Sequence, residues 1–232
     1  KGDFISHEDI ENGRVTHLAW TPDGQILTVA TSAGNVYSFL AKMSVLFAVS
    51  KSSVGYLSSL REVSIVDAVK RSRPVDVTVK LEPAFIALGA RHIAAGMNNR
   101  VYYHRIAGGA NAGPVNEQEY VGVVKEVRLN DEYAAVLTDA KVILHVIEPP
   151  ANQPIKTRTF PSREEGSYSK ITCMALTDDF LFYGTEAGTV EMFYLSEWTI
   201  LSGVELRLDN AVRKIYPNSN GTRVVVIDAA YQ

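Results

Sequence analysis

The sequence predicts an all-β protein, a partial β-propeller of about five blades plus the start of a sixth. The first observation is a hairpin phrase, Phe180–Leu195, in which two apolar segments flank a turn at Gly188. Glycine can take positive φ in such a turn at no steric cost. The second observation is that weaker copies recur at Ile26–Leu40, His92–Ile106, Tyr133–Ile147 and Arg223–Gln232. Their starts at 92, 133, 180 and 223 are 41, 47 and 43 residues apart, which is the length of a four-stranded blade.

The composition fits a globular chain and excludes several classes of protein. Of the 232 residues, 46% are hydrophobic and 21% are charged, which is enough apolar material for a sizeable core. The net charge of −3 lacks the basic excess of nucleic-acid-binding chains, so no nucleic acid partner is expected. The single Cys173 allows no internal disulfide and is expected to be a small buried hydrophobe. No apolar run approaches the roughly 18 residues that span a bilayer, so no transmembrane segment is expected.

We divide the chain into a polar lead-in, residues 1–13, and a partial propeller, residues 14–232. The lead-in has no basic region followed by an apolar stretch, so it does not resemble a secretory signal. Because the sequence does not begin with Met, we expect it to be a piece of a longer protein.

The first half of the chain is expected to hold one regular and one degenerate blade. The first blade is predicted to contain Arg14–Trp20, Ile26–Thr31, Asn35–Leu40 and, as a fourth strand, Val45–Val49. Pro22 and Gly24 mark its first turn. Residues 54–80 are predicted to form one blade with a missing or shortened strand, interrupted by the basic loop Lys70–Pro74.

The pattern is clearer after residue 84. The third blade is predicted from Ala84–Gly89, His92–Met97 and Val101–Ile106, followed by a flexible loop at Gly108–Asn116. The fourth is predicted from Val121–Leu129, Tyr133–Leu137, Val142–Ile147 and an outer strand at Ile155–Phe160. The fifth is predicted from Ile171–Leu176, Phe180–Gly184 and Val190–Leu195. Ala211–Tyr216 and Arg223–Ile227 begin the sixth.

The repeats resemble WD40 repeats, whose third strand usually ends in Trp-Asp. Alignment on the turns places a ring in every Trp position, at Phe39, His104, His145 and Phe193. The Asp position holds Leu40, Arg105, Val146 and Tyr194. The usual polar network of that Asp with a His and a hydroxyl therefore cannot form. We expect the rings to fill the space between neighbouring blades, and the blades to depend more on apolar packing.

The sequence contains no motif that predicts catalysis or a cofactor. Metal-hydrolase, nucleophile-elbow and phosphate-loop patterns are all absent. His104 and His145 could be taken for a metal pair, but their equivalent positions in successive repeats indicate a shared structural role. Asp178 and Asp179 are predicted to lie in a solvated hairpin turn. We therefore expect no enzymatic activity, no metal and no cofactor.

Two features are candidates for contact with a partner. Lys70, Arg71 and Arg73 could hold an acidic partner or a phospholipid head group, and a solvated loop is the alternative. Trp198 lies beyond the end of a strand and could be an interface anchor, since aromatic residues are enriched at interfaces. Packing against a neighbouring blade is the alternative for Trp198.

Several longer segments carry a more specific resemblance. They are Leu18–Lys42, Tyr56–Ile65, Leu81–Tyr103, Tyr133–Glu148, Leu176–Leu195 and Asn220–Asp228. Together they resemble the WD-repeat subunits of intraflagellar transport complex A. The segment HIAAGMNNRVYY is the most specific, because generic WD40 repeats do not share it. The resemblance covers most of the second of two N-terminal propellers in that family.

The resemblance implies a scaffold that works in cilia and flagella. The implied partners are other subunits of intraflagellar transport complex A and cargo adaptors, with membrane association only through the complex. The implied roles are retrograde transport and ciliary entry of membrane proteins. The implied location is the cilium or flagellum and its basal body, on the cytoplasmic side. The family offers no catalytic residues to carry over.

Two other functional interpretations are compatible with the sequence. One is a WD40 scaffold of a vesicle-coat or other trafficking complex, which only the specific segments above distinguish. The other is a propeller enzyme, which would need convergent polar residues at strand ends facing the central channel. The strand starts carry mostly apolar residues, which disfavours the enzyme.

Overall fold

The computed structural model describes residues 7–41, 45–70, 73–108, 112–139, 141–150, 156–161, 169–201, 206–218 and 221–231. The prediction of an all-β fold is confirmed, because these residues form antiparallel strands and one short 3-10 helix, η1 (Ile106–Gly108). Across the described residues, no helix has the length and apolar character needed to cross a bilayer. The chain divides into two compact units, Lys1–Val45 and Leu46–Gln232, and we describe each by itself.

The first unit is a single three-stranded sheet. Its strands are β1 (Val15–Trp20), β2 (Ile26–Thr31) and β3 (Val36–Leu40), in the order β1-β2-β3. All three were predicted, β1 from its alternation of apolar and polar residues and the other two as a copy of the repeated hairpin phrase. The turn from β1 to β2 closes through a hydrogen bond from the Gly24 amide to the Thr21 carbonyl, with Gly24 at φ 68°.

The second unit begins with a complete four-stranded sheet, which corrects two predictions. Its strands are β4 (Phe47–Ser50), β5 (Ser53–Ser59), β6 (Glu62–Asp67) and β7 (Val75–Thr78). The predicted fourth strand at Val45–Val49 does not complete the first sheet, because β4 pairs with β5 from Phe47↔Tyr56 to Ser50↔Ser53. The predicted degenerate blade is likewise wrong, since no strand is missing from this sheet.

The physical cause of both errors is the turn at Lys51-Ser52. It joins β4 to β5 with Lys51 at φ 52°, a conformation that usually calls for glycine or asparagine. Neither residue type marks this turn, so no local signal separates Val45–Val49 from the preceding blade.

The third sheet contains a strand that the sequence analysis missed. It consists of β8 (Phe85–Leu88), β9 (His92–Met97), β10 (Arg100–Arg105) and β11 (Asn116–Glu119). The outer strand β11 pairs with β10 directly after the predicted flexible loop. Its sequence, Asn-Glu-Gln-Glu, has no apolar alternation, because an outer strand with a solvated face needs none.

The remaining sheets follow the predicted order. The fourth contains β12 (Glu126–Leu129), β13 (Tyr133–Leu137), β14 (Val142–Val146) and β15 (Thr157–Phe160). The fifth contains β16 (Ile171–Leu176), β17 (Phe180–Thr185), β18 (Thr189–Tyr194) and two short outer strands, β19 (Thr199–Ile200) and β20 (Leu206–Arg207). The sixth contains β21 (Val212–Pro217) and β22 (Val224–Asp228). The described residues thus form five sheets and the start of a sixth, as predicted.

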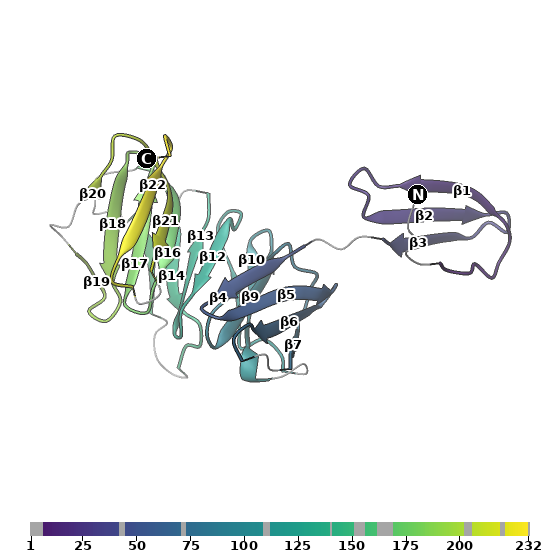
Figure 1. The fold of residues 1–232 in the computed structure, drawn as a ribbon, viewed down its shortest axis with the longest axis horizontal. Helices are drawn as coiled ribbons and strands as arrows, with labels where there is room; N and C mark the ends of the chain where they lie inside the picture. Colours follow the sequence, from purple (N-terminus) through teal and green to yellow (C-terminus); the bar gives the residue numbers. More distant parts are fainter. Residues whose placement is uncertain are drawn as a thin grey trace. The chain divides into compact units, whose positions relative to one another are not determined.

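The sheets of the second unit are stacked through their first strands. Contacts join β4 to β8, β8 to β12, β12 to β16, and β16 to β21. Figure 1 shows these sheets in chain order, from blue through teal and green to yellow. First strands that meet at one side, with later strands further out, are the arrangement of propeller blades.

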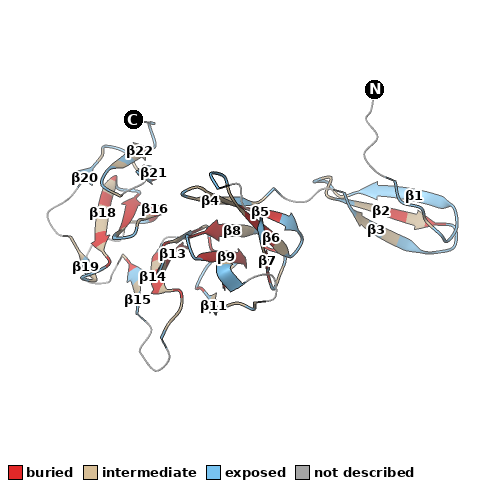
Figure 2. Ribbon diagram, turned by 60° about the horizontal axis from the view of Figure 1, so that its bottom comes forward, coloured by how far each residue is buried: buried red, intermediate tan, exposed pale blue. Residues whose placement is uncertain are grey.

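The hydrophobic core lies between neighbouring sheets rather than inside one of them. The best-filled cluster joins Leu144 and Phe160 of the fourth sheet to Leu181 and Phe193 of the fifth. Three similar clusters join the second sheet to the third, the third to the fourth, and the fifth to the sixth. Figure 2 shows buried residues of the second unit on strands such as β8, β9 and β16. Cys173 is buried in the last of these clusters, as predicted.

Candidate partner-docking site

The basic loop is exposed in its described residues. Lys70 and Arg73 are both exposed, while Arg71 lies outside the described residues. The backbone amides of Val69 and Lys70 donate to the Asp67 carboxylate at 2.9 and 3.0 Å. The Lys70 hydrogen bond lowers the pKa of Asp67, so the turn that precedes the loop is held by an ionised carboxylate. A partner contact at these three residues remains a prediction.

Trp198 is half-buried and packs against the fourth and fifth sheets. Its ring meets Phe193 edge-on with centroids 5.2 Å apart, and lies 5.6 Å from the Tyr133 ring. The Lys156 ammonium sits 4.3 Å above the Trp198 ring, a cation–π geometry. Much of the Trp198 ring is therefore used in packing between blades, which was the alternative to a partner contact. A partner contact through its exposed part remains a prediction.

The rings in the Trp position are all buried in the second unit. His104, His145 and Phe193 are buried, and Phe193 belongs to the cluster between the fourth and fifth sheets. In the first unit, Phe39 is only half-buried. The prediction that the rings fill space between blades is thus confirmed for Phe193, and the ring of His145 lies 5.4 Å from that of Tyr103 in the preceding sheet.

A buried polar network accompanies the apolar packing between the third and fourth sheets. The Tyr120 hydroxyl lies 2.6 Å from both the Tyr103 hydroxyl and Nε2 of His145. Nδ1 of His145 lies 2.9 Å from the Val146 carbonyl. Because a carbonyl can only accept, Nδ1–H donates to it and Nε2 is left to accept from Tyr120. Desolvation lowers the pKa of His145 and raises those of both tyrosines, so all three groups are neutral at pH 7.

This network supplies polar contacts between the blades although the Asp positions hold Arg105 and Val146. It joins the third sheet, the segment after β11 and the fourth sheet through hydroxyl and imidazole groups. His145 is engaged in it and is not free to act as a metal ligand. Among the described residues, no group of three or more potential metal-ligating side chains comes together. Sequence reasoning missed the network because Tyr103 and Tyr120 meet only after folding.

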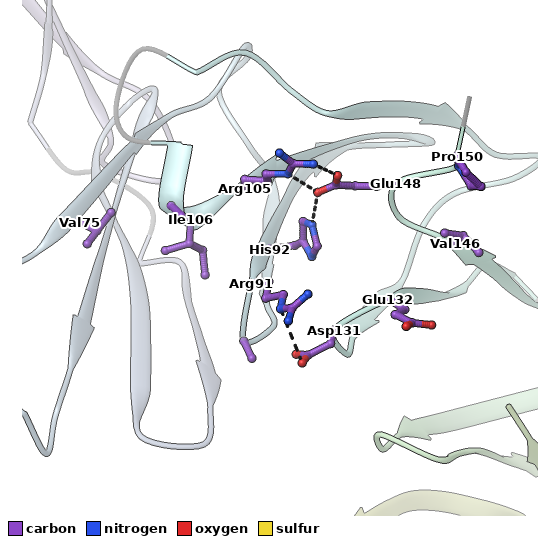
Figure 3. Close-up of a pocket in the computed structure, with 12 residues that line it drawn as sticks. Val75, Arg91, His92, Arg105, Ile106, Asp131, Glu132, Val146, Glu148 and Pro150 are labelled. Atoms are coloured by element: carbon purple, nitrogen blue, oxygen red, sulfur yellow. Dashed lines mark hydrogen bonds and ion pairs between the residues drawn. The ribbon is translucent and has the colours of Figure 1, made fainter. Parts of the chain in front are cut away.

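A pocket of about 890 Å³ opens beside the first turns of the third and fourth sheets. Its apolar wall includes Val75, Ile106, Ala107, Val146 and Pro150. Its polar wall includes Arg91, His92, Arg105, Asp131, Glu132 and Glu148. Figure 3 shows His92 and Arg105 directed at Glu148 on one side of the pocket, and Arg91 directed at Asp131 on another.

The Glu148 carboxylate is the most strongly held charge in this pocket. Arg105 binds both of its oxygens, with Nε 2.5 Å from Oε1, and Nε2 of His92 lies 2.6 Å from Oε1. These contacts, chiefly the hydrogen bonds from Arg105, lower the pKa of Glu148 to about 2. Glu148 is therefore an ionised anchor and not a general acid at neutral pH.

A second cavity of about 390 Å³ shares Asp131 and Glu132 with the first. It is also lined by Asp178 and by the buried Asn130. Asp178 was predicted to be solvated in a turn; it is exposed there, and its carboxylate lies 3.7 Å from the Lys51 ammonium. Arg91 and Asp131 form a similar pair at 3.8 Å.

These paired residues occupy equivalent positions in successive sheets. Lys51, Arg91, Asp131 and Asp178 all lie in the turn between the first and second strands of their sheet. The ion pairs therefore bring four such turns, spread over 128 residues of sequence, to one side of the second unit. The sequence repeat places Arg91, Asp131 and Asp178 after the first strand of a blade, but it does not reveal Lys51, because the turn at Lys51-Ser52 carries no glycine or asparagine.

The larger pocket is suited to holding a ligand. Within the described part of the chain, its lining offers guanidinium, imidazole and carboxylate groups, and no hydroxyl, thiol or lysine side chain. It combines an apolar wall with a few fixed charges, which is the composition of a recognition site.

Comparison with known proteins identifies close relatives of this chain. A family model described as the WDR19 second beta-propeller matches residues 54–232. WD repeat-containing protein 19 of Homo sapiens is 40% identical over 228 residues, which cover 97% of this chain and 16% of that protein. The Mus musculus protein of the same name is 37% identical over 97% of this chain and 17% of its own length. WD repeat-containing protein dyf-2 of Caenorhabditis elegans is 29% identical over 85% of this chain and 15% of its own length.

Solved structures with the same fold are more distant in sequence. The β-propeller domain of Myceliophteria thermophila Cps50 (Swd1) gives a TM-score of 0.54 at 14% identity, over 95% of this chain and 64% of that domain. KlHsv2 with a replaced loop gives 0.59 at 13% identity, over 81% of this chain and 61% of that chain. These likenesses show the propeller fold alone. The chain spans about a sixth of the length of the curated relatives it matches.

Proposed function

Because this chain belongs to the WD repeat-containing protein 19 family, through its second β-propeller, we propose that it is a docking scaffold of intraflagellar transport complex A. The observation that carries this proposal is the family match over residues 54–232, together with 40% identity to the human protein across nearly the whole chain. A distant resemblance in fold alone would not distinguish this family from other propeller scaffolds.

Under this proposal the propeller binds other subunits of the complex and cargo adaptors. It contributes to retrograde ciliary transport and to the entry of membrane proteins into the cilium. Its location is the cilium or flagellum and the basal body, on the cytoplasmic side, and it reaches membranes only through the complex. Under the same proposal it performs no chemical reaction.

The structure offers physical support for a docking role. The second unit stacks its sheets through cores that are filled by large side chains, so it presents turns on a rigid frame. Binding to a rigid surface costs less conformational entropy than binding to one that must become ordered. The charged turns and the pockets between them are the features that such a frame holds in place.

The test is recovery of partners from ciliated cells by the tagged full-length protein. We expect subunits of intraflagellar transport complex A to co-purify, and their recovery to fall when residues 46–232 are deleted. Recovery of vesicle-coat subunits without ciliary transport subunits would contradict the proposal and favour the vesicle-coat alternative. Quantitative mass spectrometry of the two preparations is the measurement.

A further inference from the structure

The two cavities described above adjoin each other, and we call them together the groove. They share Asp131 and Glu132 as a common wall. The larger cavity has an apolar wall, whereas carboxylates dominate the charged lining of the smaller one. No basic side chain among the described residues lines the smaller cavity.

The acidic cavity is held in place by a buried asparagine. Oδ1 of Asn130 accepts the amides of Glu132 and Tyr133 at 3.0 and 2.6 Å. Its Nδ2 donates to the Thr177 carbonyl at 2.9 Å, which ties this turn to the corresponding turn of the fifth sheet. The positions of Glu132 and Asp178 relative to each other are therefore fixed before any partner arrives.

The charges of this groove are only weakly neutralised from within. Lys51 and Arg91 pair with Asp178 and Asp131 at 3.7 and 3.8 Å, and all four side chains are at least half exposed to solvent. Such surface pairs contribute about 0–1 kcal/mol each and can be replaced by a better-placed cation. For the Glu132 carboxylate, no basic partner is present among the described residues.

A buried nitrogen in the larger cavity is also left without a partner. Nε2 of His92 donates to the ionised Glu148, and the side chain of His92 is only 6% exposed. Its Nδ1 has no hydrogen-bond partner in the described part of the chain. A buried nitrogen of this kind favours a ligand that brings a polar group to it, because an unmade buried hydrogen bond costs about 1–3 kcal/mol.

We propose that the two cavities form a docking groove for a basic segment of a partner protein, whose arginine or lysine enters the acidic cavity while a neighbouring apolar side chain enters the larger one. The proposal rests on the docking role proposed above and adds the chemistry of the partner. An arginine suits the acidic cavity best, because its planar fork of N–H donors can bind two carboxylates at once.

The test uses fluorescence polarisation with the full-length protein and labelled nine-residue peptides. Each peptide has a Ser-Gly background with one Arg and one Leu, placed one to four residues apart. We expect at least one spacing to bind, and its affinity to fall at least tenfold when Arg is replaced by Glu or when the protein carries Glu132→Lys.

A matched control is Glu186→Lys. Strand β17 begins just after Asp178 and Asp179, and the exposed Glu186 follows its other end. Glu186→Lys therefore makes the same change of charge as Glu132→Lys, but at the end of β17 that is far from the groove. We expect Glu186→Lys to bind the peptide as the unchanged protein does. Equal weakening by Glu186→Lys and Glu132→Lys would overturn the inference, as would a panel in which no Arg peptide binds better than its Glu counterpart.

The same variants separate this inference from the proposed function. If Glu132→Lys abolishes peptide binding but still co-purifies with the transport complex, both ideas stand and the groove serves a separate partner. If complex subunits co-purify but the peptides show no charge dependence, the groove inference alone fails. If the full-length protein recovers no ciliary transport subunits, the proposed function fails whatever the peptides do.

Discussion

The hairpin Ile26–Leu40 in the first unit and the hairpin Phe180–Leu195 in the second share their turn but not their burial. In both, a glycine amide bonds the carbonyl of the threonine three residues earlier, and the glycines have φ of 83° and 84°. The second hairpin buries Leu181 and Phe193 completely. Of the first hairpin's hydrophobic side chains, the described core includes only Val29.

The difference separates what a hairpin specifies from what its neighbours supply. Strand pairing and turn geometry follow from the local sequence, because both hairpins form the same ladder. Burial follows from stacking, because the second hairpin lies between two core clusters shared with adjoining sheets. The first hairpin has only β1 beside it in its three-stranded sheet, and β1 is exposed along its whole length.

The largest expected effect is that of removing a ring from the stacked hairpin. Phe193→Ala should lower the free energy of unfolding of the second unit by about 3–5 kcal/mol, because it empties a fully buried site beside Phe160 and Trp198. Phe39→Ala, at the equivalent position of the first hairpin, should cost about 1 kcal/mol, since Phe39 is half-buried.

The unfolding of the two units in urea can be followed separately by tryptophan fluorescence, because each unit contains one of the two tryptophans. Trp198 fluorescence reports the second unit in a Trp20→Phe background, and Trp20 reports the first in a Trp198→Phe background. Equal costs for Phe193→Ala and Phe39→Ala would show that stacking is not the source of the difference.

The turn glycines give a closer comparison, because their backbones match. A Cβ on Gly188 would lie 2.3 Å from the Leu208 carbonyl oxygen and 2.8 Å from that of Asn210, whereas a Cβ on Gly34 would meet nothing within 4 Å. Gly34→Ala should therefore cost only the about 1–2 kcal/mol of a positive φ. Gly188→Ala should cost more than this and shift the strand β20 away. Thermal unfolding of both variants is the measurement, and a larger loss for Gly34→Ala would contradict the expectation.

A smaller effect is expected from the polar network, which lies in the second unit. Tyr120→Phe removes the hydroxyl that donates to Nε2 of His145. The remaining hydrogen-bond partner of this nitrogen is then the Tyr103 hydroxyl, which is 3.3 Å away. We expect a loss of about 1–3 kcal/mol. A double-mutant cycle with Tyr103→Phe measures the coupling, and strictly additive losses would mean that the hydroxyls do not act as a network.

The smallest expected effect is a change in pH dependence. The pKa of Glu148 is lowered to about 2 from the usual 4.5, so its contribution to stability is present at neutral pH and is lost as the pH falls from about 4.5 to about 2. Glu148→Gln should flatten the stability profile of the second unit in this window. The urea midpoint at pH 6, 4 and 3 is the measurement. An unchanged profile would mean that Arg105 and His92 do not stabilise the ionised carboxylate.

Most of the fold could be predicted because alternating apolar residues and turn glycines are local signals. The strands around Gly188 and Gly34 were placed within one or two residues on that basis. The turn at Lys51 was missed because its positive φ is held by context and not by residue type. Strand β11 was missed because a polar outer strand carries no period-two pattern.

The candidate site could be predicted far less well than the fold. Lys70 and Trp198 stood out in the sequence by charge and by ring, which are properties of single residues. The groove depends on which turns lie close together in the folded chain, as in the pairing of Lys51 with Asp178. No local pattern in the sequence predicts such a pairing. Asn130 shows the same limit, since its side chain links turns that are 47 residues apart.

The placement of the core clusters between neighbouring sheets also sets how disturbances spread through the second unit. Each sheet shares a core only with the sheets before and after it, so the unit behaves as a one-dimensional stack. Opening of the fourth sheet therefore exposes two clusters, the one shared with the third sheet and the one shared with the fifth. Amide hydrogens of β13 and β14 should exchange more slowly than those of β1, which is exposed along its whole length.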